Sequence, residues 1–143
     1  MVRIFVLNGV NLKPLGERRP EVYGEQTLKD IEQLVRNAFP DVEFAFRQTD
    51  YEGELVAWIH EAADSNGLVL NPGAWTHYSY AIHDALETLS VPKVEVHLSN
   101  VHSREGWRRE SVVSPVVDAV VAGMGAYGYR VAIGFIFDAA GRG

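Results

Sequence analysis

Residues 4–24 read IFVLNGVNLKPLGERRPEVYG, an apolar run that passes into a long polar segment. Residues 4–7 form a continuous apolar stretch of strand length, which predicts a buried strand. Residues 8–24 then show neither helical nor strand periodicity. Connections of that length are uncommon in compact domains and usually form lids or binding loops. We therefore expect a buried first strand followed by a functional lid over about residues 12–24.

The remainder of the chain alternates between strand and helix patterns. Thr27 is a plausible helix cap, with the Asp30 carboxylate in the first turn. Strands are expected over residues 4–7, 42–47, 68–70, 93–98 and 116–122, and helices over 28–39, 55–63, 78–89 and 129–137. Such alternation produces a parallel sheet with right-handed crossovers. The sequence predicts an α/β fold, a flavodoxin-like three-layer sandwich whose five-stranded parallel sheet has the order 2-1-3-4-5 with helices on both faces.

The composition is that of one soluble globular domain covering residues 1–143, with 47 % hydrophobic and 22 % charged residues. A net charge of -6 argues against nucleic acid as a partner. The absence of cysteine excludes disulfides and thiol chemistry. The N-terminal apolar run is too short for a secretion signal, and no later run has the length to span a bilayer. We expect a cytoplasmic protein with no membrane partner.

Polar side chains follow strands 1, 3 and 4, which the predicted order places side by side. In such sheets, ligands bind beyond the carboxyl ends of the strands, near the point where the strand order reverses. The polar residues that follow these strands are Asn8, Asn11, Asn71, His77, His97 and Ser99. We therefore expect a binding site at this edge of the sheet.

Glu95, His97 and Ser99 alternate with apolar residues, so they share one face of the fourth strand. A carboxylate beside a histidine fixes its tautomer or raises its proton affinity. The alternative is a structural ion pair, although central strands of parallel sheets are usually apolar on both faces. Glu95, His97 and His102 also offer zinc-ligand side chains, but their spacing gives no reason for a fixed three-ligand geometry. We expect acid–base chemistry without a metal.

Asn71-Pro72-Gly73 is typical of a type II turn. The helix expected after it carries His77 and Asp84 on one face, about 10 Å apart. One small pocket can hardly use both from the same chain, so Asp84 is either a surface carboxylate or part of a subunit interface. His60 and His83 stand among helix residues with no polar cluster nearby, and we expect ordinary surface or packing roles for them.

Arginines are concentrated in two loops, as Arg18 and Arg19 in the first and Arg104, Arg108 and Arg109 after the fourth strand. In an acidic protein, arginines around a pocket indicate an anionic ligand, although some of the five are expected only to solvate their loops. No glycine-rich loop opens a helix as a phosphate site requires, so a carboxylate is the favoured ligand.

Tyr23 lies five residues after Arg18 on the expected lid. An unperturbed phenol has a pKa of about 10, and a base that works near neutral pH needs roughly 3–4 kcal/mol of preferential stabilisation of the phenolate. One or two desolvated arginines can supply that energy. Tyr23 is therefore either a general base or a packing residue of the lid.

Four motifs extend over nearly the whole chain. They are Asn8-Gly9-x-Asn11-Leu12 with Leu15-Gly16-x-Arg18-x-Pro20-x-x-Tyr23-Gly24, then Glu52-Gly53-Glu54-Leu55, then Asn71-Pro72-Gly73-Ala74-x-Thr76-His77-x-Ser79 with Asp84, and finally Glu95-Val96-His97-Leu98-Ser99-Asn100-x-His102-x-Arg104-Glu105 with Arg108 and Ser114-Pro115. Together they resemble the motifs of the type II 3-dehydroquinate dehydratases.

The departures from that family's pattern are modest. Val10 replaces the usual proline, Arg19 the common glutamate, Trp75 a smaller residue or tyrosine, and His83 a residue that is usually not histidine. Val10 and Trp75 are candidates to reshape the loop and the pocket, and Arg19 to change lid closure. No matched catalytic position is lost.

The resemblance implies a cofactor-free lyase of the shikimate pathway or of quinate catabolism, which removes water from 3-dehydroquinate by anti elimination through an enolate and forms 3-dehydroshikimate. The implied catalytic residues are Tyr23 as base, Arg18 lowering its pKa, His97 as general acid, Glu95 orienting it and Asn11 stabilising the enolate through a water. The implied substrate contacts are Asn71, His77 and Arg108 to hydroxyls, the backbone around Leu98 and Ser99 to the carboxylate, and Asp84 from a neighbouring subunit.

The resemblance also implies a small carboxylic acid as substrate and a homododecamer built from trimers. Two other interpretations remain. A flavodoxin-like flavin or phosphoacceptor domain is disfavoured because the sequence lacks a phosphate-cradling loop and an acidic cluster after the first strand. A non-catalytic binder of quinate-like acids would keep the pocket without turnover.

Overall fold

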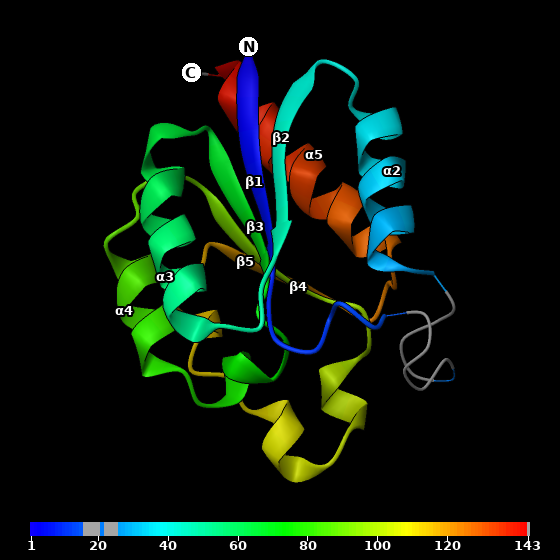
Figure 1. Cartoon of the computed structure of the whole chain (residues 1–143), viewed down its shortest axis with the longest axis vertical. Coiled ribbons are helices and arrows are strands. Elements are labelled where there is room, and N and C mark those ends of the chain that lie inside the picture. The colour runs from blue at the N-terminus through cyan, green and yellow to red at the C-terminus, as the bar shows by residue number, and fades with distance from the viewer. Residues whose placement is uncertain (16–20, 22–25, 143) are drawn as a thin grey trace.

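The computed structural model describes residues 1–15, 21 and 26–142, and it confirms the predicted fold. Figure 1 shows a central sheet with helices on both faces. All strand pairings are parallel, and the order is β2-β1-β3-β4-β5. The strands are β1 Val2–Asn8, β2 Val42–Gln48, β3 Gly67–Asn71, β4 Lys93–His97 and β5 Ala119–Ala122.

Each face of the sheet has its own apolar core. Ile4 and Val6 of β1 belong to one cluster, whereas Phe5 and Leu7 belong to the other. Because β1 is buried on both faces, its sequence is a continuous apolar run rather than an alternating one. The first cluster lies under the helices α2 Leu28–Ala38 and α5 Tyr127–Arg142, and the second lies under α3 Glu52–Glu61 and α4 Tyr80–Glu87 (Figure 1).

Helix α2 begins at the cap that the sequence predicts. The Thr27 hydroxyl accepts a hydrogen bond from the Asp30 amide at 3.0 Å, and the Asp30 carboxylate accepts one from the Thr27 amide, also at 3.0 Å. This reciprocal capping box satisfies two backbone donors that the helix itself leaves without acceptors. Ile31 and Val35 are buried and fasten the helix to the sheet.

The turn after β3 differs from the predicted type II turn. Pro72 has φ -76° and ψ -8°, Gly73 has φ 61°, and the chain enters a short 3₁₀ helix, Gly73–His77. The Asn71 side-chain oxygen accepts a hydrogen bond from the Gly73 amide at 3.2 Å, so the asparagine turns the chain through its own side chain. The type II prediction was wrong because it considered only the proline and the glycine.

Helix α4 starts later than predicted because Ser79 caps it. The Ser79 hydroxyl accepts a hydrogen bond from the Ile82 amide at 3.1 Å, and the first helical residue is Tyr80. His77 therefore lies in the preceding 3₁₀ helix while Asp84 lies in α4. The expectation that His77 and Asp84 share one helix face was wrong.

Other boundaries shift by a few residues. Helix α3 begins at Glu52 rather than at residue 55, and β5 is shorter than predicted because Ser114–Val116 forms a 3₁₀ turn. Helix α5 extends beyond the predicted 129–137 at both ends. No helix in the described part of the chain combines the length and the apolar character needed to cross a membrane.

Gly9 joins the ends of β1 and β3 at the rim of the sheet. Its amide donates to the Asn71 carbonyl at 2.8 Å. A Cβ atom at this position would lie 2.5 Å from the carbonyl oxygen of Pro72 and 2.9 Å from the ring of Trp75. The close approach of the two chain segments therefore requires glycine.

We expect Gly9→Ala to lower the free energy of unfolding by about 1–3 kcal/mol, because backbone atoms must move to admit the methyl group. The matched control is Gly53→Ala in α3, where a Cβ meets nothing within 4 Å. Alanine there should stabilise the helix by roughly 0.5–1 kcal/mol. Denaturant unfolding followed by tryptophan fluorescence measures both changes, and wild-type stability of Gly9→Ala would contradict the steric argument.

Candidate active site

A pocket opens beyond the carboxyl ends of β1, β3 and β4, next to the point where the strand order reverses. It holds about 530 Å³ of empty space, part of it open to solvent. Its lining residues are Val10, Asn11, Leu12, Asn71, Gly73, Ala74, His77, His97, Leu98, Ser99, Val101, Arg104 and Arg108.

The pocket brings together most of the predicted site residues. Asn11, Asn71, His77, His97, Leu98, Ser99 and Arg108 all line it. Glu95 does not line the pocket itself, but it accepts a hydrogen bond from His97, which does. Asp84 is not among the lining residues of its own chain, and Arg18 and Tyr23 lie outside the described residues.

Two other positions behave differently from expectation. Asn8 was expected at this edge, but it is fully buried and its amide group donates to the Arg47 carbonyl at 3.0 Å. Trp75 was a candidate to reshape the pocket, but it belongs to the core under α3 and α4 and does not line the cavity. Val10 does line it. Arg19 lies outside the described residues.

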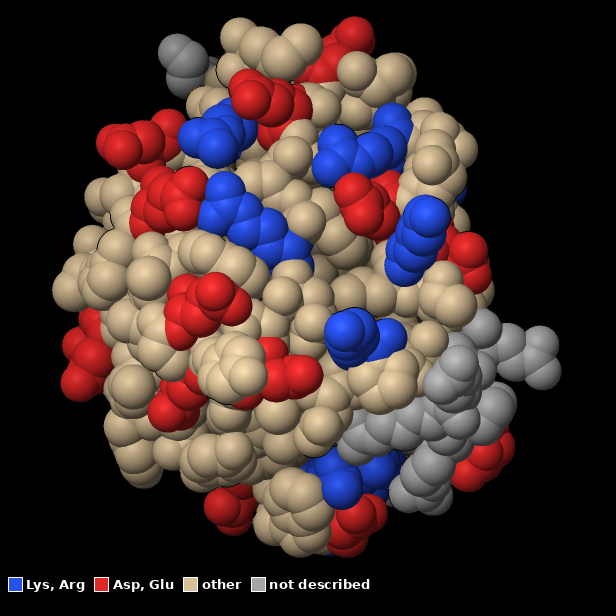
Figure 2. Space-filling view, viewed as in Figure 1, with Lys and Arg blue, Asp and Glu red and all other residues tan. Residues whose placement is uncertain are grey.

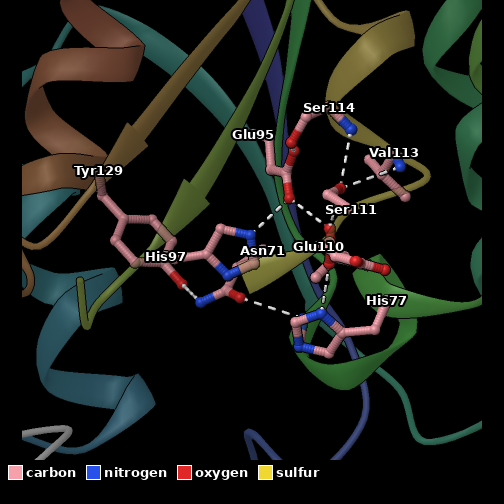
Figure 3. Close-up of polar contacts among 11 residues, drawn as sticks. Asn71, His77, Glu95, His97, Glu110, Ser111, Val113, Ser114 and Tyr129 are labelled. Atoms are coloured by element: carbon pink, nitrogen blue, oxygen red, sulfur yellow. Dashed lines mark hydrogen bonds and ion pairs between the residues drawn. The ribbon is translucent and has the colours of Figure 1, made fainter. Parts of the chain in front are cut away.

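The central pair of the site is Glu95 and His97 on β4. Glu95 has no exposed surface, and one of its carboxylate oxygens lies 2.5 Å from His97 Nε2 (Figure 3). A carboxylate accepts hydrogen bonds, so Nε2 carries the hydrogen. Within the described residues this leaves His97 Nδ1 as the ring nitrogen available to a ligand.

Glu95 is also held by a set of hydroxyl groups. Thr76 donates to one carboxylate oxygen and Ser114 to the other, both at 2.5 Å. Ser111 accepts from the amides of Val113 at 3.0 Å and Ser114 at 2.9 Å, so its own hydrogen must go to Thr76 at 2.6 Å. Hydrogen bonds therefore run in one direction, from the backbone through Ser111 and Thr76 to Glu95.

These contacts decide the charge of Glu95. Burial raises the pKa of Glu95, but hydrogen bonds from His97, Ser114 and Thr76, together with the charge of His97, outweigh burial and hold that pKa below its ordinary value. Hydrogen bonds to the charged form favour that form. Glu95 is therefore an ionised carboxylate next to His97, and it orients the imidazole.

His77 presents the other imidazole of the pocket. Its Nδ1 lies 2.6 Å from the Glu110 carbonyl, which can only accept, so Nδ1 carries the hydrogen. Among the residues that the structure describes, this leaves Nε2 to accept a hydrogen from a ligand when the ring is neutral. The Trp107 ring meets His77 edge-on at 5.1 Å between centroids. Two contacts therefore fix the plane of the His77 ring.

Two arginines supply positive charge to the pocket. Arg108 stacks on Trp107 at 4.0 Å from the ring centroid, and its Nε donates to Glu105 at 2.5 Å. Arg104 also lines the pocket and lies 3.4 Å from the Ser99 hydroxyl. The sequence predicts Arg104 in the basic loop and in the fourth motif, but it was not among the residues expected to bind substrate or to act in catalysis. Its position just after the β4 cluster was the available signal.

The positive charge is local rather than general. On the face seen in Figure 2, basic and acidic side chains are interspersed without an extended basic area. With a net charge of -6, this distribution suits a small anion better than a nucleic acid backbone.

Asn11 has an unusual backbone conformation at the edge of the pocket. Its φ is 64°, a left-handed value that few residues other than glycine adopt and that asparagine tolerates best. The backbone amide of Asn11 donates to the Asp50 carboxylate at 3.0 Å, and this hydrogen bond anchors the strained turn. Local strain of this kind is common where a side chain must point into a site.

The zinc alternative finds no support in the described residues. Glu95, His97 and His102 do not form a group whose donor atoms could share an ion. Such a group does occur at His83, Asp84 and Glu87 on α4, among residues that do not line the pocket.

His83 is not the isolated histidine that the sequence predicted. Its Nδ1 lies 2.6 Å from the Val112 carbonyl and its Nε2 lies 3.2 Å from Glu87. The hydrogen bond to Val112 and the nearby carboxylates raise the pKa of His83. The prediction was wrong because the Val112 segment approaches α4 from a distant part of the sequence.

Comparisons with known proteins agree with this geometry. The profile of the family Dehydroquinase class II matches residues 2–137. The chain is 53 % identical over 138 residues to the 3-dehydroquinate dehydratase of Kineococcus radiotolerans, covering 94 % of both chains. It is 50 % identical over 133 residues to 3-dehydroquinate dehydratase 1 of Agrobacterium fabrum, covering 91 % of this chain and 92 % of that one.

A solved structure gives the same result. The type II dehydroquinase from Butyrivibrio crossotus superposes with a TM-score of 0.92 at 39 % identity, covering 94 % of this chain and 97 % of that one. The resemblance read from the four motifs is therefore confirmed over the full architecture. The chain belongs to the class II dehydroquinase family.

Proposed function

We propose that this protein is a 3-dehydroquinate dehydratase that forms 3-dehydroshikimate and water by anti elimination through an enolate. The observation that carries the proposal is an ionised, buried Glu95 fixing His97 at a pocket that also holds arginines, in a chain of this family. The substrate class follows from the names of the relatives and from the positive charge of the pocket. The reaction belongs to the shikimate pathway or to quinate catabolism.

His97 acts as the general acid. Glu95 holds Nε2–H, so in the imidazolium form the other hydrogen, on Nδ1, is available to the departing hydroxyl. Loss of that hydroxyl as water requires a proton at the leaving oxygen, and a positioned imidazolium contributes about 10²–10⁴-fold to such steps. Glu95 orients the ring by accepting its Nε2 hydrogen.

Tyr23 acts as the base that removes the proton next to the ketone, and Arg18 lowers the pKa of Tyr23. Exclusion of water from the occupied site strengthens the effect of the guanidinium on the phenolate. Asn11 stabilises the enolate through a water. The strained turn at Asn11 supports this role because it places the side-chain amide of Asn11 at the edge of the pocket.

The remaining pocket residues hold the substrate. Asn71, His77 and Arg108 bind its hydroxyls, and the backbone at Leu98 and Ser99 binds its carboxylate. Asp84, which does not line the pocket of its own chain, contributes from a neighbouring subunit in a homododecamer built from trimers. No cofactor takes part in this mechanism.

The first test is turnover of 3-dehydroquinate, followed by the ultraviolet absorbance of the new enone. We expect wild-type turnover and a loss of about 10²–10⁴-fold in kcat for Tyr23→Phe, with affinity for the inert acid quinate largely kept. Tyr51→Phe, at an exposed tyrosine, is the control. A wild-type protein that binds quinate without turnover would favour the binder interpretation, and an active Tyr23→Phe would remove Tyr23 as the base.

A second prediction concerns Arg18. In Arg18→Ala the phenolate loses its cationic neighbour, so the limb of the kcat/KM profile that reports the base should move to higher pH by about one unit or more. Arg109→Ala, at an exposed arginine outside the pocket, should leave the profile in place. An unmoved profile in Arg18→Ala would exclude the electrostatic role.

A third prediction concerns Glu95. Glu95→Gln removes the carboxylate that accepts the His97 Nε2 hydrogen and orients the ring, and we expect roughly 10²–10³-fold lower kcat. Because the pKa of Glu95 is lowered in the folded protein, its carboxylate stabilises the fold above its ordinary pKa of 4.5, and this contribution is lost as the pH falls through the folded-state value. Glu95→Gln should therefore flatten the stability profile in acid. Exposed Glu43→Gln is the control for both measurements.

A further inference from the structure

Tyr129 on α5 carries a polar group into the centre of the molecule without a role in the mechanism above. The residue has no exposed surface and belongs to the apolar cluster under α2 and α5. Its hydroxyl nevertheless meets the amide of Asn71, a pocket-lining residue (Figure 3). The same hydroxyl also contacts Asn8, which the sequence had placed among the chemical residues.

These side chains form a continuous line of hydrogen bonds between two backbone groups. The Gly73 amide donates to Asn71 Oδ1 at 3.2 Å, and Asn71 Nδ2 donates to Tyr129 Oη at 2.9 Å. Tyr129 Oη donates to Asn8 Oδ1 at 2.7 Å, and Asn8 Nδ2 donates to the Arg47 carbonyl at 3.0 Å. The line begins at an amide that can only donate and ends at a carbonyl that can only accept.

The two ends fix the direction of every hydrogen bond between them. The Arg47 carbonyl requires a donor, so Asn8 turns its nitrogen there and its oxygen toward Tyr129. The Tyr129 hydroxyl has a single hydrogen, which Asn8 receives, so Asn71 must supply the hydrogen on the other side. If the Asn71 side-chain amide were reversed, its NH₂ group would face the Gly73 N–H, another donor, and its oxygen would face the Tyr129 oxygen without a hydrogen between them. Each buried polar group left without a partner costs roughly 1–3 kcal/mol.

We infer that Tyr129 is a positioning residue that fixes Asn71 as a hydrogen-bond donor to an oxygen of the bound acid. Asn71 keeps one amide hydrogen beyond the one given to Tyr129, and that hydrogen is what the residue offers to the pocket. Burial raises the pKa of Tyr129, so the hydroxyl keeps its hydrogen at working pH. The inference rests on the proposed function only for the identity of the ligand.

Tyr129→Phe removes the hydroxyl and keeps the ring, so the core remains filled. We expect KM for 3-dehydroquinate and the dissociation constant of quinate to rise roughly 3–10-fold, the effect of about one hydrogen bond, while kcat changes little. Tyr127→Phe, at an exposed tyrosine of the same helix, should change neither constant. A purely structural role predicts a lower melting temperature with both constants unchanged, and that result would overturn the inference.

A double-mutant cycle tests whether Tyr129 acts through Asn71. If it does, Asn71→Ala and the double variant Asn71→Ala/Tyr129→Phe should bind quinate equally within about twofold, because the group that Tyr129 positions is already absent. Additive losses in affinity would show that Tyr129 acts by another route and would overturn the assignment.

Asn8→Ala provides a second variant if Tyr129→Phe does not fold. It frees the hydroxyl hydrogen to turn toward Asn71, so the donor arrangement at the pocket weakens and quinate affinity should fall. Wild-type affinity in either folded variant contradicts the inference. If the wild-type protein binds quinate without converting 3-dehydroquinate, the proposed function fails, and the quinate affinities still decide the role of Tyr129.

Discussion

The buried carboxylate of Glu95 is the constraint on which the rest of the site depends. An ionised carboxylate without partners in a protein interior costs several kcal/mol, so the surrounding chain must supply donors. Thr76 comes from the 3₁₀ helix after β3, Ser114 from the turn before β5, and His97 from β4 itself. Three separate segments therefore converge on one side chain, and of these residues His97 lines the pocket.

Backbone groups of known polarity determine how the side chains of this site are protonated. The amides of Val113 and Ser114 direct the Ser111 hydrogen toward Thr76, whose own hydrogen goes to Glu95, and the Glu110 carbonyl sets the tautomer of His77. A backbone amide can only donate and a backbone carbonyl can only accept, so these contacts leave one arrangement of hydrogens for Ser111 and for the Nδ1 side of His77. Preorganised donors of this kind need little rearrangement as charge develops, which is the main source of electrostatic catalysis.

The sequence was sufficient for the architecture because each strand leaves a short apolar or alternating segment between helical patterns, and β1 and β3, which are buried on both faces, contain continuous apolar runs. It also located the polar residues that follow β1, β3 and β4, since parallel strands end at one edge. It could not reveal that Asn8 faces Tyr129 or that His83 reaches the Val112 carbonyl, because these contacts join residues far apart in the chain. The prediction of the turn type at Asn71 failed for a local reason, because the Pro-Gly pattern does not reveal the side-chain hydrogen bond of Asn71.

Residues 110–112 form a strap that is held in place through its main chain. His77 donates a hydrogen bond to the carbonyl of Glu110, and His83 donates one to the carbonyl of Val112. The backbone amide of Val112 donates to the Thr76 carbonyl at 2.8 Å. All three attachments use main-chain atoms of the strap, which every amino acid except proline possesses in full. The exposed side chain at position 110 is thus free to vary over generations without releasing Ser111 from Thr76, whereas Val112 also packs against the core under α3 and α4.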